Sequence, residues 1–230
     1  NETLRKALIL RTQKDQDVVW NHYLSWFYVQ QKEFGKAFIQ EKSIYKRSPE
    51  SLSSIVSLGQ LAIEEQDHET AKEILGFVLE NTNDLELLIQ AHSYLLKMKI
   101  EKAQEKDFVA INTELIGLLA EYETSPTTLS LQLIQAHFVA FNLRKPEEGK
   151  SIIKKALELQ LNPYEVAQAK MELADILLFE EKFNQALLYY SQIEEDLKND
   201  EVAHEASLKA AKTSYFQGDF VWALKQFKEL

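Results

Sequence analysis

Apolar residues recur every three or four positions along most of the chain. Between residues 84 and 122 no proline interrupts the pattern, and Leu88, Ala91, Leu95 and Met98 fall on one helical face. Short polar stretches that carry turn or cap residues break the pattern at 12–17, 47–50, 81–84, 124–127, 161–163 and 198–200. The pattern predicts an all-α chain in which segments of about thirty-five residues each form two helices and a tight turn.

Four of the predicted turns share one form, in which a large ring is followed three residues later by alanine. The pairs are Phe34 and Ala37, His68 and Ala71, Phe183 and Ala186, and Phe220 and Ala223. Ten residues before each ring begins a pair whose second member is small: Leu24–Ser25, Leu58–Gly59, Leu173–Ala174 and Ala210–Ala211. A small residue at a fixed place lets two helices approach closely. An apolar stripe follows each alanine, although Glu41 interrupts it in the first repeat.

The repeat has the spacing of a known family. Ala37 and Ala71 are 34 residues apart, and the chain resembles the tetratricopeptide repeat (TPR), with Leu58–Gly59, Ala71 and Leu75 as the best matches and Pro49 at the repeat-ending position. The resemblance implies a right-handed α-α superhelix of about six helix pairs plus a partial N-terminal helix, forming a single domain over residues 1–230. The predicted units are 18–51, 52–83, 84–123, 127–162, 163–200 and 201–230.

Both ends of the chain fall inside predicted units. Residues 2–13 have the pattern of the second helix of a preceding unit, and Leu230 stops within another. We therefore expect a window from a longer protein, and a regulatory repeat region of a larger signalling protein is one open interpretation.

Composition excludes several classes of protein. Only 6 Gly and 4 Pro are present, too few for the many tight turns of an all-β fold. The formal net charge of −10 disfavours nucleic acid as a partner, and no apolar run is long enough to span a bilayer. The absence of Cys, together with the missing initial Met, favours a bacterial exported protein of the periplasm or cell envelope, with the cytoplasm also open.

Enzymatic motifs are missing from the sequence. His68–Glu69 and His204–Glu205 begin like a zinc-protease motif, but Lys72 and Leu208 stand where its second histidine would be. No glycine-rich phosphate loop and no nucleophile elbow occur. The sequence predicts a non-enzymatic protein without catalytic residues, metal or cofactor.

The TPR resemblance implies that the first helix of each pair lines a concave groove that binds a protein or peptide partner. The helix at 18–30 is apolar on every side, which indicates contacts beyond its own repeat. The resemblance places seven candidate residues in the groove: Val19, His22, Trp26, Phe138, Phe141, Phe179 and Tyr215. His22 and Trp26 occupy positions where carboxylate-clamp members of the family carry Lys and Asn, so no such clamp is expected. Three other interpretations stay open: self-association as a homodimer, a small-molecule receptor, and rings that simply fill the interior.

Overall fold

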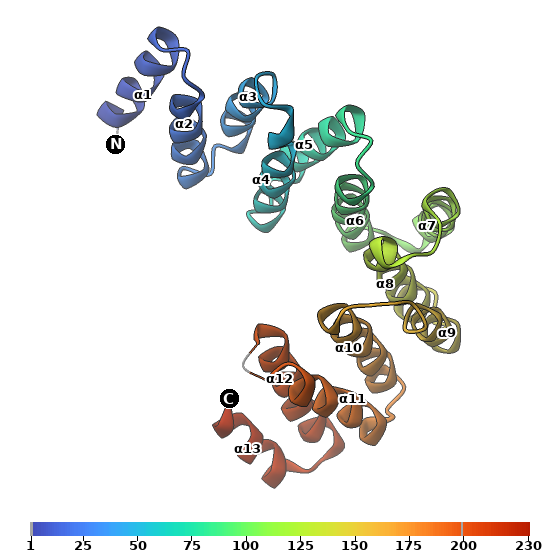
Figure 1. Cartoon of the computed structure of the whole chain (residues 1–230). Coiled ribbons are helices and arrows are strands. Elements are labelled where there is room, and N and C mark those ends of the chain that lie inside the picture. Colours follow the sequence, from blue (N-terminus) through green and yellow to red (C-terminus); the bar gives the residue numbers. More distant parts are fainter. Residues whose placement is uncertain (1, 199) are drawn as a thin grey trace. The chain divides into compact units, whose positions relative to one another are not determined.

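The computed structural model describes residues 2–198 and 200–230, and almost all of these belong to helices (Figure 1). The chain divides into two compact units, one ending at Glu101 and the other beginning at Lys102. The first unit contains α1 (Glu2–Lys14), α2 (Val18–Gln30), α3 (Phe34–Tyr45), η1 (Pro49–Ser51), α4 (Leu52–Glu64), α5 (His68–Asn81) and α6 (Leu85–Glu101). The second contains η2 (Glu105–Asp107), α7 (Phe108–Tyr122), η3 (Pro126–Thr128), α8 (Leu129–His137), η4 (Phe138–Asn142), α9 (Pro146–Ala156), α10 (Pro163–Phe179), α11 (Phe183–Asp196), α12 (Glu201–Gln217) and α13 (Phe220–Glu229).

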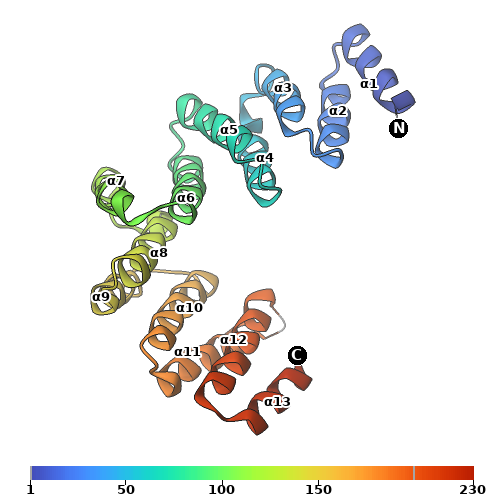
Figure 2. The ribbon, with the colours of Figure 1, turned by 180° about the vertical axis from the view of Figure 1, so that it is seen from behind.

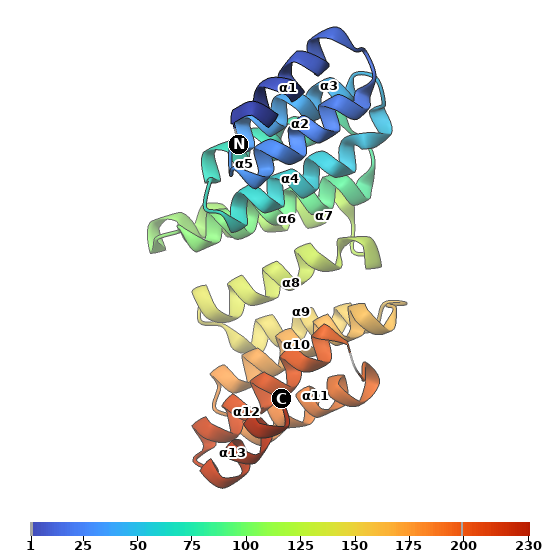
Figure 3. The same cartoon turned by 90° about the vertical axis from the view of Figure 1, so that its left-hand side faces the viewer.

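Successive helices form hairpins that stack within each unit. In the first unit α2 pairs with α3 and α4 with α5 (Figure 2). In the second, α10 pairs with α11 and α12 with α13, while α9 packs on both α8 and η4 (Figure 3). The boundary between the units lies inside the predicted repeat 84–123, because α6 packs on α4 and α5, whereas α7 packs on α8 and η4. Within the described residues, no helix is long and apolar enough to cross a membrane.

Acidic and amide side chains begin many of these helices. An N-terminal helical turn leaves backbone N–H groups without partners, and a carboxylate or amide oxygen at the cap position accepts from them. The caps Asp17, Asp67, Asn162, Asp200 and Asp219 accept from the N–H groups of Val19, Thr70, Glu165, Val202 and Trp222, respectively. These residues lie at predicted helix breaks or immediately before predicted turns, so local sequence positions the helix starts.

The turns inside the hairpins share one backbone feature. A residue with positive φ occurs at Lys32, Gln66, Arg144, Glu181 and Gly218. Lys32 and Gln66 are 34 residues apart, and the last three follow one another at intervals of 37. Because this conformation is unfavourable for any residue with a Cβ atom, its recurrence shows that hairpin packing dictates it. The repeat therefore exists in the backbone even where the sequence of the turn differs.

Small residues allow the paired helices to approach. Ala37, Ala71 and Ala186 are fully buried, and Ala223 is 2% exposed. A Cβ atom on Gly59 of α4 would lie 2.8 Å from Leu75 Cδ2 of α5. The recurring form of the turn seen in the sequence thus corresponds to the contact points of the hairpins.

Glu41 is the polar interruption of the apolar stripe, and it is buried. Its Oε1 atom accepts a 2.5 Å hydrogen bond from the Ser25 hydroxyl of α2, and its Oε2 atom has no hydrogen-bond partner among the described residues. Both residues are less than a tenth exposed. An unsatisfied buried carboxylate oxygen costs free energy that a hydrocarbon side chain would not.

We expect Ser25→Ala to lower the free energy of unfolding by about 2 kcal/mol, because it leaves the Glu41 carboxylate with no partner. Combining it with Glu41→Leu should restore at least the original stability, since the pair is then replaced by apolar groups. Urea denaturation measures both variants, with the exposed Ser57→Ala of α4 as the control expected to change little. A single Ser25→Ala variant as stable as the control would contradict this account.

Candidate partner-binding surface

The three candidate residues of the first unit lie on one face of α2. Val19, His22 and Trp26 are spaced by three and four residues and are all exposed, Trp26 by 58%. A second tryptophan of the same helix, Trp20, is held locally, because its Nε1–H donates to Asp15 Oδ2 at 2.9 Å. The large exposed rings of α2 are therefore those of Trp26 and of Tyr23, which is 54% exposed.

Phe138 does not contribute to an exposed surface, and its assignment to the groove is wrong. Residues Phe138–Asn142 form the π-helix η4, in which the N–H of Leu143 donates to the carbonyl of Phe138 at 3.1 Å. Phe138, the first residue of this wider turn, lies fully in the core, edge-to-face with Phe108 at a centroid distance of 5.5 Å. A pattern with 3.6 residues per turn cannot anticipate the extra residue.

The same π-helix brings Phe141 next to Phe179. Phe141 is half-buried, and its ring centroid lies 5.0 Å from that of Phe179, which is 49% exposed at the end of α10. Tyr215, near the end of α12, is 55% exposed and contacts both Phe216 and Phe220, at 6.0 and 5.3 Å. We call Phe141, Phe179, Tyr215 and Phe216 the aromatic row, because each lies at the C-terminal end of the first helix of a hairpin.

Charged side chains link these first helices close to the aromatic row. His137 Nδ1 lies 2.9 Å from Glu172 Oε1, which joins α8 to α10. Lys209 Nζ lies 2.5 Å from Asp175 Oδ2, which joins α12 to α10. We call these four residues the charged ladder. α10 packs against both α8 and α12, so the ladder crosses three neighbouring helices.

Physical surroundings shift the pKa values of this ladder. The hydrogen bond to Glu172 raises the pKa of His137 above its usual range, more than burial lowers it. Burial lowers the pKa of Lys209, but the Asp175 hydrogen bond and the nearby carboxylates outweigh it, so the net shift is upward. Burial and the charge of Asp175 raise the pKa of Tyr190, whose hydroxyl donates to Asp175 Oδ1 at 2.6 Å. The hydrogen bonds of the ladder therefore favour the positively charged forms of His137 and Lys209.

Sequence reasoning missed the charged ladder, although the repeat period contains a signal for it. His137 and Glu172 are 35 residues apart, and Asp175 and Lys209 are 34 apart. Residues one repeat apart occupy neighbouring helices of the stack, so opposite charges at that spacing can pair. The Tyr94 hydroxyl, which donates to Gln60 Oε1 at 2.7 Å across 34 residues, follows the same rule in the first unit.

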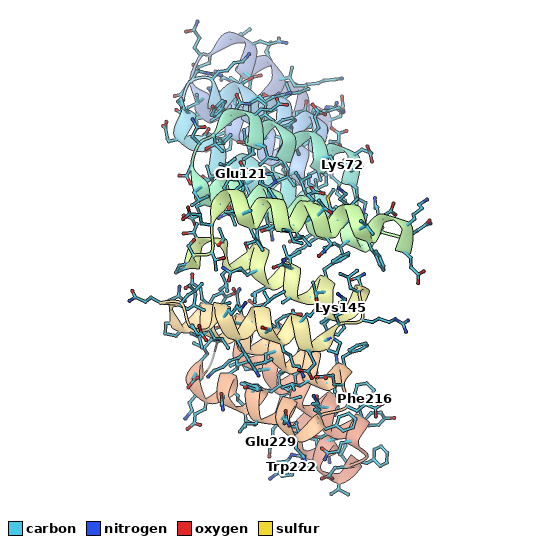
Figure 4. The ribbon with its side chains drawn as sticks, turned by 90° about the vertical axis from the view of Figure 1, so that its right-hand side faces the viewer. Lys72, Glu121, Lys145, Phe216, Trp222 and Glu229 are labelled. Atoms are coloured by element: carbon cyan, nitrogen blue, oxygen red, sulfur yellow. The ribbon has the colours of Figure 1, made fainter. Side chains whose placement is uncertain are left out.

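Two other surface features lie at the end of the second unit. An open hollow of about 310 Å³ at α11, α12 and α13 is lined mostly by polar and charged residues, among them Glu194, His204 and Glu229, and also by Ala203 and Leu230. Helix α13 exposes apolar side chains, with Val221 85% and Phe220 61% exposed. Figure 4 labels Phe216 and Trp222 at this end of the unit.

Among the described residues, no group of three or more His, Cys, Asp or Glu could hold a metal ion.

Solved structures with the same arrangement of helices include named TPR proteins. TTC0263, a thermophilic TPR protein in Thermus thermophilus, superposes with a TM-score of 0.57 at 16% identity, over 86% of this chain and 98% of that one. A tetratricopeptide repeat protein from Parabacteroides merdae gives 0.54 at 19% identity, over 89% and 77%. The chain has a TPR-like fold.

The TPR-like fold confirms the predicted all-α class of stacked helix pairs. Yeast Tom70 is similar as well, with a TM-score of 0.58 at 15% identity over the whole of this chain, which spans about half of Tom70 (47%). No protein-family model and no curated protein matches the sequence. TPR-like folds generally serve as non-enzymatic scaffolds for protein interactions.

Proposed function

We propose that this TPR-like chain binds a partner peptide or helix along the first helices of its hairpins, with the aromatic row of the second unit as the principal contact. The observation that supports this most is the exposure of Phe179, Tyr215 and Phe216, each between 49% and 63%, at equivalent places on successive hairpins. Scattered exposed rings are ordinary on a protein surface, whereas rings repeated with the period of the fold lie at corresponding places on neighbouring hairpins.

Ring contacts prepare this surface for binding. Phe141 supports Phe179, and Phe220 supports Tyr215, so the exposed rings are held in place before a partner arrives. A rigid aromatic side chain loses little conformational entropy on binding and serves well as an anchor in a pocket or groove. A partner with apolar side chains at helical or extended spacing suits such a surface.

The first unit offers a separate contact strip on α2, formed by Val19, His22 and Trp26. Trp26 has the largest exposed ring of this strip, and tryptophan is among the residues most often responsible for binding energy. The net charge of −10 should repel acidic partners, which restricts both surfaces to neutral or basic segments.

We expect Phe179→Ala to weaken partner binding at least about tenfold, because it removes an anchor ring and with it the ring contact between Phe179 and Phe141. The matched control is Leu188→Ala on α11, whose side chain is 57% exposed on the second helix of the same hairpin. A photoreactive residue at position 215 identifies the partner by crosslinking in the native cell extract, and titration calorimetry with the purified partner then gives the affinities.

Self-association through the same rings is the competing interpretation, and light scattering over a concentration series of the protein alone distinguishes it. Equal affinity of Phe179→Ala and Leu188→Ala for the crosslinked partner would show that the aromatic row is not the binding surface.

A further inference from the structure

His137 connects three parts of the second unit. It is the last residue of α8, and the π-helix η4 begins at the next residue. Its imidazole lies 4.5 Å, centroid to centroid, from the Phe141 ring at an interplanar angle of 35°, and its Nδ1 atom lies 2.9 Å from Glu172 Oε1 of α10. The His137 side chain is 51% exposed, whereas that of Glu172 is 17% exposed. One imidazole therefore touches the aromatic row, lies at the start of the π-helix and bridges two helices.

The π-helix makes this position sensitive to small changes. π-Helices are rare, occur mostly as single turns and are frequent at functional sites, because their wider hydrogen-bonding pattern competes poorly with the α-helical pattern. Within η4 lie a core ring, Phe138, and the half-buried ring Phe141. Contacts at the ends of the π-turn help decide whether the chain keeps the π-helical or the α-helical hydrogen-bonding pattern, and His137 supplies one such contact.

The charged groups around His137 come from two helices. Glu172 and Asp175 of α10 both favour the imidazolium, and Lys209 of α12 opposes it. η4 carries no charged residue, and in α9 Lys150 pairs with Glu147 and Glu180 rather than with His137. The hydrogen bond to Glu172 is the largest influence and raises the pKa of His137 above its ordinary range. The imidazolium form of His137 is therefore favoured relative to that of an ordinary imidazole, whose charge changes within the physiological pH range.

We propose that His137 and Glu172 form a proton-dependent clasp, in which the imidazolium holds α8 against α10, keeps η4 in its π register and keeps Phe141 beside Phe179. Loss of the proton leaves a neutral imidazole N–H that donates to the Glu172 carboxylate, so the attraction between two opposite charges is lost and the contact weakens. The clasp loosens as the pH rises, and the aromatic pair loses its fixed arrangement. The clasp regulates the aromatic row, so its role rests on the proposal that the aromatic row binds a partner. The test of the clasp measures the protein alone and requires no partner, so either proposal can fail without the other.

The sign of the effect on stability follows from the direction of the shift. A histidine whose pKa is raised by folding adds stability that is complete below the ordinary imidazole value of about 6.5 and is lost as the pH rises through the folded-state value. Local opening of η4 should therefore become easier as the pH rises from mildly acidic to mildly alkaline values.

Hydrogen exchange of the η4 amides tests the clasp in the wild-type chain, in His137→Gln and in the control His22→Gln, whose histidine is exposed on α2 of the other unit. We measure exchange between about pH 5.5 and about pH 8.5, a range that spans imidazole titration, and correct it for the intrinsic rate. In the wild type and the control we expect the protection of residues 141–143 to fall about fivefold across this range, the size of one hydrogen bond. In His137→Gln the protection should not vary with pH.

Glu172→Gln provides a second variant, because it keeps an acceptor but removes the charge. NMR titration of the His137 ring in this variant should give a lower midpoint than in the wild type. The pH at which the protection of η4 against hydrogen exchange falls should be lowered in the same way. Wild-type protection that is flat across the range, or pH dependence that persists unchanged in His137→Gln, would overturn the proposal.

Discussion

Replacing Glu180 with alanine is expected to lower the free energy of unfolding by about 3 kcal/mol, the cost of leaving a buried charge without its buried partner. Glu180 Oε2 accepts a 2.5 Å hydrogen bond from Lys150 Nζ, and the two side chains are only 14% and 8% exposed. Burial lowers the pKa of Lys150, but its bonds to Glu147 and Glu180 outweigh this and the net shift is upward. Without Glu180 the buried ammonium keeps only Glu147, whose carboxylate is largely in solvent.

Glu147→Ala is the matched control, because it removes a carboxylate from the same ammonium. Glu147 bonds Lys150 Nζ at 2.7 Å, but its side chain is 77% exposed, and exposed ion pairs contribute less than about 1 kcal/mol. Chemical denaturation at pH 7 should separate the two variants clearly. Lys150→Met combined with Glu180→Leu should recover most of the loss. Equal effects of Glu180→Ala and Glu147→Ala would show that burial does not govern this pair.

Gly149→Ala is expected to cost about 2 kcal/mol, because α9 approaches α8 and η4 too closely for a side chain. A Cβ atom at Gly149 would lie 2.8 Å from the carbonyl oxygen of Ala136 and 2.8 Å from Ala140 Cβ. Neither atom belongs to a flexible side chain, so the helices themselves must move apart. The same shift would disturb the π-helix that positions Phe141.

Gly117→Ala provides the opposite result within the same unit. Gly117 lies in α7, and a Cβ atom there would have no neighbour within 4 Å. Alanine restricts the unfolded chain and favours helix, so this variant should gain about 0.5–1 kcal/mol. Thermal and urea unfolding of the two variants should move in opposite directions. A Gly149→Ala variant that gains stability would mean that the close contact at α9 does not constrain the hairpin.

The repeat architecture could be predicted from the sequence because its determinants are local. A capping side chain such as Asp67 acts within three residues, and a buried alanine such as Ala71 recurs at a fixed distance along the chain. The predicted place of Phe179 and Tyr215 on first helices follows from that period, and both are exposed. Whether they contact a partner stays a prediction.

The different burial of Phe138 and Phe141 could not be predicted from the helical period of the sequence. Both rings fit the apolar pattern, and only the π-turn at 138–142 separates them, sending one into the core and leaving the other beside Phe179. Helix α9 packs closely against the same segment, since a Cβ atom on Gly149 would lie 2.8 Å from the Ala136 carbonyl oxygen and 2.8 Å from Ala140 Cβ. A helical period describes one helix in isolation and carries no information about such a contact.

The sequence by itself determined that the chain is all helical, where most helices begin, and that hairpins recur with a period near that of TPR proteins. Tertiary structure alone decided which rings face outward, which charges pair across one repeat, and that Glu41 and Lys150 are buried. The physical reason is the range of the forces involved. Helix capping and turn conformation act over a few neighbouring residues, whereas burial and charge pairing depend on helices that are a full repeat apart along the chain.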